Sequence, residues 1–215
     1  YASHEFRTPL AVLKGTLEVL IRKPRQREEY EEKVKYSLRE IDRLNHLVDE
    51  LLTLTRFENQ KMSLSFEEVN IEQIINDTLK YLSENIQQKN ITIKTNISPA
   101  AVYLRTDTNL FTTILNNLSH NEIKFSHKDR VIEIDIRKEK EFIIFEIKDN
   151  GKGIPTQDLK KIFDKFYRSS DHVDIKGFGL GLPIVKRFCS LLNIRIDILS
   201  QEGFGTIVKL QIPQS

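Results

Sequence analysis

A histidine near the start of the chain lies among residues that could make it a nucleophile. His4 is followed by Glu5 and, four residues on, by Thr8. Apolar residues of this segment recur at helical spacing, and at about 100° per residue His4 lies roughly 200° from their centre, on the solvent face. Glu5 could accept a hydrogen bond from one ring N–H, which would leave the other ring nitrogen free to attack phosphorus.

A proline close to this histidine favours chemistry over an ordinary surface position. Pro9 lies inside the predicted helix and cannot donate to the carbonyl of Glu5. The backbone ladder therefore opens within one turn of His4, and a kink is expected there. Without the proline, an exposed His beside a Glu would be interpreted as a plain surface pair.

Two asparagines and a lysine form a second candidate group. Asn117 and Asn121 are four residues apart and share one helix face, where two amide oxygens could meet a Mg²⁺ ion that keeps several waters. Lys124 follows three residues later and could reach phosphate groups as a point charge. Taken alone, the same three residues would also suit a solvent-facing helix surface.

Glycines at alternate positions form a third group. Gly177, Gly179 and Gly181 lead into a helix predicted over 179–192. A loop of this kind can present backbone N–H groups and the positive helix end to phosphates. The spacing differs from the G-x-G-x-x-G pattern of dinucleotide-binding folds. For this stretch alone, a flexible surface loop is the alternative.

Two long amphipathic segments must position His4. Apolar residues recur at steps of three and four in both, and Pro24 with its charged neighbours separates them. The pattern predicts a hairpin of two long helices, whose narrow stripes would be covered if two hairpins paired into a four-helix bundle. Periodicity alone equally permits a coiled-coil spacer without chemistry. The stripes are Phe6, Leu10, Leu13, Leu17 and Leu20, then Tyr30, Val34, Leu38, Ile41, Leu44, Val48, Leu51 and Leu54.

The rest of the chain alternates between helical and strand patterns, which predicts an α/β sandwich of one mixed sheet with helices on one face. The whole chain is therefore expected to be α+β, with a domain boundary that gives domains 1–62 and 63–215. Besides 179–192, helices are predicted at 70–88 and 107–124, and strands at 91–95, 131–136, 142–147, 194–199 and 205–212.

Composition narrows the classes of function. The 33 basic and 31 acidic residues leave a net charge of +2, so no nucleic acid partner is expected. The single cysteine, Cys189, excludes an intramolecular disulfide and a Cys-based zinc site, and it suits a small buried hydrophobe. No apolar run is long enough to span a membrane, and the chain begins without Met. We expect a cytoplasmic fragment of a longer protein.

The sequence around the histidine resembles a known motif. Ser3-His4-Glu5-Phe6-Arg7-Thr8-Pro9-Leu10 matches at every position the phosphoacceptor box, S-H-E-[FL]-R-T-P-L, of the sensor histidine kinases of two-component signalling. Further motifs resemble the other boxes of this family and follow in its order, so the resemblance covers essentially the whole chain. They are an asparagine box at 117–126, a first glycine box at 149–154, a phenylalanine box at 163–168, a second glycine box at 177–182 and a short terminal box at 203–206.

The resemblance implies a Bergerat-type ATP-binding fold for 63–215, with ATP and Mg²⁺ as cofactors. Asn121 would hold the metal, and Asp149 would accept from the adenine amino group, which discriminates adenine from guanine. Residues 164–178 would form a lid over the nucleotide. The nucleotide-binding residues that the family implies are Asn117, Asn121, Lys124, Phe125, Asp149, Gly151, Gly153, Ile154, Arg168, Gly177, Gly179, Leu180, Gly181, Leu182 and Thr206.

The resemblance also implies a reaction and partners. ATP would donate its γ-phosphoryl group to His4, assisted by Glu5, and the phosphohistidine would pass the group to an Asp of a response regulator receiver domain. Thr8 would orient a water for dephosphorylation of that regulator. The chain would form a homodimer through residues 1–60, and a segment upstream of it would anchor the full-length protein in the cell membrane.

Two alternatives remain open. An ATPase of the gyrase, chaperone or mismatch-repair type shares the ATP-binding fold but lacks an acceptor-histidine hairpin, so residues 1–60 argue against it. A non-catalytic dimerisation scaffold would keep the motifs and lose the chemistry.

Glu122 is the clearest departure from the family pattern, which has Ala or Gly after the second Asn of the asparagine box. On a helix its side chain points about 100° away from that of Asn121. We therefore expect Glu122 to face solvent or to pair with a neighbour such as Lys124. The alternative is a side chain turned toward the phosphates, which its charge would repel.

Overall fold

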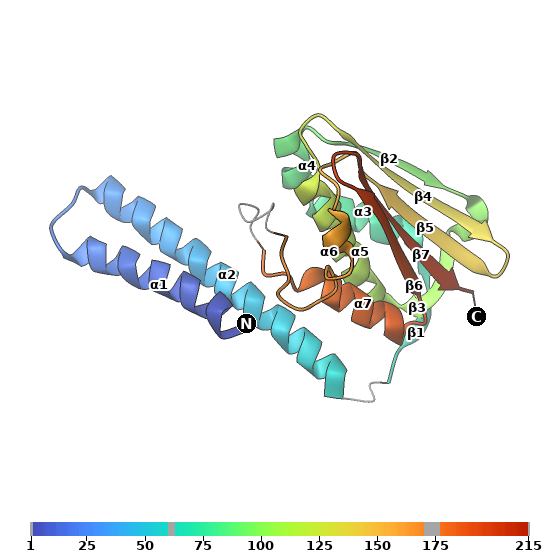
Figure 1. Ribbon diagram of the computed structural model, residues 1–215, viewed down its shortest axis with the longest axis horizontal. Helices are drawn as coiled ribbons and strands as arrows, with labels where there is room; N and C mark the ends of the chain where they lie inside the picture. The colour runs from blue at the N-terminus through green and yellow to red at the C-terminus, as the bar shows by residue number, and fades with distance from the viewer. Residues whose placement is uncertain (1, 60–62, 170–176, 215) are drawn as a thin grey trace. The chain divides into compact units, whose positions relative to one another are not determined.

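The chain consists of two compact units, Tyr1–Gln60 and Lys61–Ser215. The computed structural model, drawn in Figure 1, describes residues 2–59, 63–169 and 177–214, with the backbone alone at 2–5 and 57–59. Among these residues, no helix combines the length and the apolar character that crossing a bilayer requires.

The first unit is the predicted helical hairpin. Helices α1 (Ala2–Ile21) and α2 (Arg27–Asn59) lie side by side and antiparallel, joined by a short turn (Figure 1). The first turn of α2 contains Glu28 and Glu29, whose negative charge interacts favourably with the positive end of the helix dipole. Helix α1 continues through Pro9, which is buried.

The hairpin buries only part of its apolar surface. Leu20, Leu47 and Leu54 are buried, whereas Leu10 and Leu17 of the first predicted stripe are 50% and 45% exposed. Exposed apolar area on this scale is unfavourable in water and marks an interaction surface. The remaining exposed large apolar side chains of the hairpin are Val12, Val19, Ile21, Tyr30, Val34, Tyr36, Leu38, Ile41, Val48 and Leu52.

The second unit is the predicted α/β sandwich. Its five-stranded sheet has the order β2-β4-β5-β7-β6, in which β2 and β4 run parallel and the other neighbours antiparallel. Helices α3, α5 and α7 cover one face of this sheet (Figure 1), and β1 pairs with β3 in a separate sheet. The elements are β1 (Phe66–Asn70), α3 (Ile71–Tyr81), α4 (Ser83–Lys89), β2 (Thr92–Ile97), a 3₁₀ turn (Pro99–Ala101), β3 (Tyr103–Asp107), α5 (Thr108–Phe125), β4 (Val131–Glu139), β5 (Phe142–Lys148), α6 (Thr156–Leu159), α7 (Gly181–Leu191), β6 (Arg195–Gln201) and β7 (Gly205–Pro213).

Some predicted bounds are wrong. The helix predicted over 70–88 is interrupted at Leu82, whose φ of −92° and ψ of 7° leave the helical range while its side chain enters the core. The predicted helix at 179–192 begins only at Gly181. Strands β1 and β3 and the short helix α6 were not predicted. They are short and contain exposed polar residues, so their apolar residues show neither the alternation of a strand nor the spacing of a helix.

The core of the second unit lies between α5 and the sheet. Helix α5 begins after Asp107, whose Oδ1 accepts from the Leu110 N–H at 3.1 Å and so caps the helix. Alternate residues of β4 point toward α5 and are buried. The side chains that fill this core include Phe111, Ile114, Leu115, Leu118, Ile132, Ile134, Ile136, Ile143, Phe145 and Ile147.

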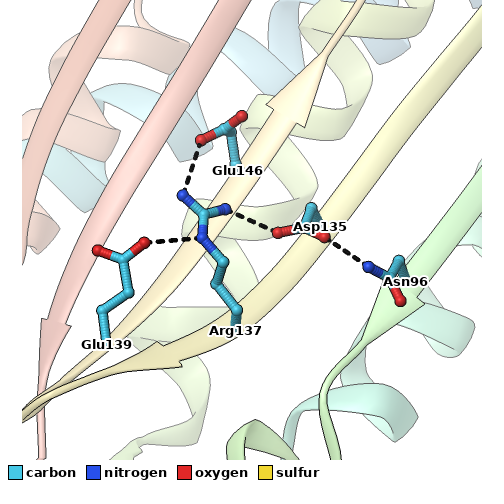
Figure 2. A network of polar contacts seen from close by, with 5 residues as sticks. All are labelled: Asn96, Asp135, Arg137, Glu139 and Glu146. Atoms are coloured by element: carbon cyan, nitrogen blue, oxygen red, sulfur yellow. Dashed lines mark hydrogen bonds and ion pairs between the residues drawn. The ribbon is translucent and has the colours of Figure 1, made fainter.

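The opposite face of the sheet carries a network of charged residues, shown in Figure 2. Arg137 of β4 pairs with Asp135 at 2.7 Å and with Glu139 at 2.8 Å. It also reaches Glu146 of β5 at 3.5 Å, and Asn96 of β2 donates to Asp135 at 2.7 Å. The network therefore joins three strands. Because its members are partly exposed, it contributes little stability and mainly keeps this face solvated.

Candidate active site

Asp149, directly after β5, is a buried carboxylate held from two sides. Its Oδ2 accepts from the backbone N–H of Thr206 at 3.0 Å, and its Oδ1 accepts from the backbone N–H of Gly151. The Asp149 N–H donates in turn to the Thr206 carbonyl at 3.0 Å. Hydrogen bonds to both oxygens fix the orientation of the carboxylate, which can then receive a ligand donor from a defined direction.

Two glycines allow the loop after Asp149 to pack closely. A Cβ at Gly151 would lie 2.8 Å from the carbonyl oxygen of Phe125, so a side chain does not fit beside the end of α5. Gly153 has a φ of +69°, a left-handed conformation that glycine adopts at little cost. The predicted site residues Phe125, Asp149, Gly151 and Gly153 therefore lie in one neighbourhood.

Ser200 connects this loop to β7, and the sequence analysis did not identify it. Its Oγ accepts from the Ile154 N–H at 2.8 Å, donates to the Gly205 carbonyl at 2.9 Å, and lies 2.9 Å from the Thr206 Oγ1. Because Oγ has a single proton, Thr206 must be the donor in the last of these contacts. A lone serine near a strand end has no sequence signal for such a role.

Asn117 and Lys124 of α5 face the glycine loop before α7. The Asn117 amide nitrogen donates to a carbonyl one turn earlier at 2.9 Å, and its oxygen points toward Gly181, where a Cβ would lie 2.7 Å away. A Cβ at Gly177 would lie 2.5 Å from the Lys124 Nζ. Half-buried Asn121 lies between Asn117 and Lys124 in α5. The structure thus places Asn117 and Lys124 beside the glycine loop that was predicted to meet phosphates.

Part of the predicted lid is described. The Phe166 N–H donates to the Gly179 carbonyl at 3.0 Å, and the Tyr167 hydroxyl donates to buried Asp158 at 2.7 Å. Arg168 is half-exposed. After the loop, Leu180 is buried and Leu182 half-buried, so both help to anchor the start of α7. Residues 170–176 of the lid lie outside the described residues.

Glu122 differs from the expectation, because it neither faces solvent nor pairs with Lys124. It is only 5% exposed and hydrogen-bonds to Asp149, which is 4% exposed. Glu122 continues the buried stripe of α5, four residues after Leu118 and seven after Leu115. Burial, the hydrogen bond to Asp149 and the negative charge of Asp149, in that order, raise the pKa of Glu122 well above its usual range.

Lys89 caps the C-terminal end of α5, and the sequence analysis did not identify this role. Its Nζ donates to the carbonyls of Ile123, Lys124 and Ser126 at 2.8, 2.6 and 2.9 Å. These are carbonyls that a helix end leaves without intrahelical partners, and a cation there opposes the negative end of the helix dipole. Burial and, secondarily, the positive charge of Lys152 lower the pKa of Lys89. The cap fixes the helix that carries Asn117 and Asn121.

The candidate acceptor residues lie at the start of α1. His4 and Glu5 are in the helix, where only the backbone is described, so the hydrogen bond between them stays a prediction. Thr8 is exposed. The predicted kink at Pro9 also stays a prediction.

The residues around the glycine loop suit Mg²⁺ in combination with a nucleotide. Within the described ranges, there is no group of three or more His, Cys, Asp or Glu side chains that could hold a metal ion. The amide oxygens of Asn117 and Asn121 are hard ligands, and Mg²⁺ typically takes few protein ligands while it keeps waters and phosphate oxygens. The site therefore fits a metal that arrives with phosphates, and does not fit a structural metal bound by protein alone.

Two protein families match the sequence. The His Kinase A (phospho-acceptor) domain matches residues 1–60, and the histidine kinase-, DNA gyrase B- and HSP90-like ATPase family matches residues 106–215. The chain is similar to the signal transduction histidine-protein kinase ArlS of Staphylococcus haemolyticus, with 35% identity over 97% of this chain and 46% of ArlS. It is 29% identical to the sensor histidine kinase WalK of Bacillus subtilis, over 98% of this chain and 35% of WalK.

Solved structures agree with this similarity. The histidine kinase AdeS of Acinetobacter baumannii has a TM-score of 0.80 and 26% identity, and the match covers 99% of this chain and 98% of that one. The histidine kinase ThkA, solved in complex with the response regulator protein TrrA, has a TM-score of 0.79 at 20% identity over 99% of this chain and 60% of that one, which shows a shared fold. The chain spans less than half the length of the curated relatives named above.

Proposed function

The chain belongs to the sensor histidine kinases, whose phosphoacceptor and ATPase domains it contains, and from this premise we propose that it phosphorylates its own His4 with ATP. One observation carries the proposal: the phosphoacceptor family covers the hairpin that bears His4, in the same chain as an ATPase domain. The ATPase family includes gyrase- and chaperone-type enzymes, and the hairpin is the feature that they lack.

The nucleotide would be held by the two groups of residues that the fold brings together. Asp149 would accept a hydrogen bond from the adenine amino group, since both of its oxygens are already oriented by backbone N–H groups. Asn117, Lys124 and the glycine loop before α7 would face the phosphates. Asn121 would hold Mg²⁺, which when bound neutralises part of the phosphate charge.

The proposed transfer needs a nucleophile and a proton acceptor. The unprotonated ring nitrogen of His4 attacks the γ-phosphorus, so that an N–P bond forms while the P–O bond to ADP breaks and ADP leaves with its electron pair. The other ring nitrogen then donates its proton to Glu5, which leaves a neutral phosphorylated imidazole. Phosphoryl transfer in such sites depends on positioning and on charge stabilisation more than on covalent chemistry by the protein.

Incubating the purified chain with γ-labelled ATP and Mg²⁺ tests the proposal. The chain should acquire a label that is lost in acid and kept in alkali, as expected for phosphohistidine. Release of free phosphate without a labelled chain would favour the ATPase alternative instead. If the chain neither binds nor consumes ATP, the result would support the alternative of a non-catalytic dimerisation scaffold.

The partners follow from the same proposal. The phosphohistidine would pass its group to an aspartate of a response regulator receiver domain, which is consistent with the complex of ThkA with TrrA. We also infer that a segment upstream of this chain anchors the full-length protein in the cell membrane, with the chain on the cytoplasmic side. The length of the relatives, more than twice that of the matched region, supports further segments.

The chain is expected to be a homodimer through residues 1–60. The exposed apolar face of the hairpin, including Leu10 and Leu17, would be covered if two hairpins packed into a four-helix bundle. Light scattering at low micromolar concentration should therefore give about twice the chain mass of 25.2 kDa. Residues 63–215 alone should remain monomeric. A monomeric full chain would contradict the expectation.

Replacing Thr8 with Ala should separate two activities. Autophosphorylation should be preserved, while dephosphorylation of the regulator should slow by at least about tenfold, because only hydrolysis needs a hydroxyl that positions a water. The measurement is the decay of a labelled regulator with each variant. Thr16→Ala, two turns further along α1, is the matched control. Equal loss of both activities in Thr8→Ala would indicate a role in helix packing.

A further inference from the structure

The side chain of Lys89, the last residue of α4, binds the C-terminal end of α5. Its Nζ donates to the carbonyl oxygens of Ile123, Lys124 and Ser126 at 2.8, 2.6 and 2.9 Å, which uses all three donors of the ammonium group. On the basis of the proposed nucleotide site, we propose that Lys89 is a positioning residue for the phosphates. It holds the last turn of α5, so that the Lys124 ammonium stays at the glycine loop before α7.

The backbone of Lys89 is fixed to the segment that follows α5. The Lys89 carbonyl accepts from the N–H of Asp129 at 3.0 Å, and the Asn90 side chain donates to the Asp129 carboxylate at 2.7 Å. Asn90 ends α4 in a left-handed conformation, with a φ of 52°. The ammonium of Lys89 therefore extends from a point that is itself bound to the connection between α5 and β4.

Lys124 connects this cap to the candidate phosphate site. Its carbonyl accepts the shortest of the three hydrogen bonds from Lys89, while its own Nζ lies 2.5 Å from the place of a Cβ at Gly177. Carbonyls at a helix end have no partners within the helix, so the last turn would fray without Lys89. The Lys124 ammonium would then have to be ordered when a nucleotide binds, and this ordering costs affinity.

The residue that would recognise the base is held by other contacts. Asp149 is oriented by the backbone N–H groups of Gly151 and Thr206, and the Thr206 hydroxyl contacts Ser200 of β6 at 2.9 Å. Loss of Lys89 should therefore weaken the binding of phosphates and leave the binding of the nucleoside unchanged. A cap that only stabilised α5 would lower the unfolding temperature without changing the ratio of these two affinities.

The test compares equilibrium binding of ADP and of adenosine at fixed pH and Mg²⁺. Lys89→Met, of similar length and without donors, should bind ADP about tenfold more weakly than the parent and adenosine equally well. Lys89→Arg keeps a cation with several donors and should restore ADP binding to within about threefold of the parent. Lys80→Met makes the same change at an exposed position in the last turn of α3 and is the control.

A second background tests whether Lys89 acts through Lys124. A Lys124→Met chain has no ammonium to be positioned, so the addition of Lys89→Met should change its ADP affinity by less than about twofold. A tenfold loss in both backgrounds would assign the effect to the charge of Lys89 or to a general loosening of α5. That result would overturn the inference.

Two further outcomes would also overturn it, namely unchanged ADP binding by a folded Lys89→Met chain and an equal loss of affinity for ADP and adenosine. Thermal unfolding checks that each variant folds, and the polar, uncharged Lys89→Gln replaces Lys89→Met if that variant does not. A parent chain that binds no ADP would contradict the proposed function itself. Normal binding by the parent together with unaffected Lys89 variants would contradict only this inference.

Discussion

Replacing His4 with Gln should reduce the acid-labile phosphoryl label to background. Glutamine is polar and fits a helix, but its amide nitrogen is not nucleophilic, so the attacking atom is lost. Nucleotide affinity should stay at the parent value, because the candidate nucleotide residues belong to the second unit, Lys61–Ser215. The measurement pairs the labelling assay with equilibrium binding of ADP.

A matched control is available in the same unit. His46 lies on the surface of α2 and pairs with Glu50 at 3.5 Å, so His46→Gln makes the same chemical change at a site without a proposed role in transfer. Label should remain in that variant. Persistent label in His4→Gln would move the acceptor to another residue and contradict the assignment.

Replacing Asp149 with Asn should weaken ADP binding by about 10- to 100-fold, since leaving a buried hydrogen-bonding group unpaired costs about 1–3 kcal/mol. The carboxylate accepts from Gly151 at one oxygen and from Thr206 at the other. In the Asn variant, an NH₂ group replaces one of the two oxygens. This group points a donor at a backbone N–H, and it cannot accept a hydrogen bond from the adenine amino group. Discrimination between ADP and GDP should fall in the same variant.

Folding must be checked for this variant, because Asp149 also organises the loop that follows it. Asp77→Asn, on the exposed side of α3, makes the same change away from the candidate site and should bind ADP as the parent does. Thermal unfolding of both variants separates lost binding from lost structure. Parent-like affinity in a folded Asp149→Asn chain would show that Asp149 does not recognise the base.

Most of the fold could be predicted because its elements have clear hydrophobic periods. The stripes of the hairpin and of α5, and the alternation in β4, follow directly from packing against one face. The interruption at Leu82 could not be predicted, since a leucine there fits the helical pattern equally well. Strand β1 was missed because four of its five residues are polar or exposed, so its pairing with β3 depends on tertiary structure.

The candidate site was predicted where local spacing determines it and missed where distant segments meet. The four-residue spacing of Asn117 and Asn121 can be read directly from the sequence. The contact of Lys89 with three carbonyls at the end of α5 forms only when α4 packs beside α5, so the sequence does not show it. Glu122 was a different kind of error. Its position four residues after Leu118 places it on the buried stripe of α5, which its angle to Asn121 alone does not reveal.

The parallel pairing of β2 with β4 has a consequence for the order of folding. Parallel neighbours require a crossover connection, and here that connection contains α5. The β4–β5 hairpin closes over two residues, of which Lys140 has a φ of 55°, and such local contacts form faster than distant ones. We therefore expect the β4–β5 hairpin to form first during refolding. Strand β2, at the edge of the sheet, would pair with β4 later, and α5 would pack against the sheet at that stage. A nucleotide bound to α5 would then slow unfolding while hardly accelerating refolding.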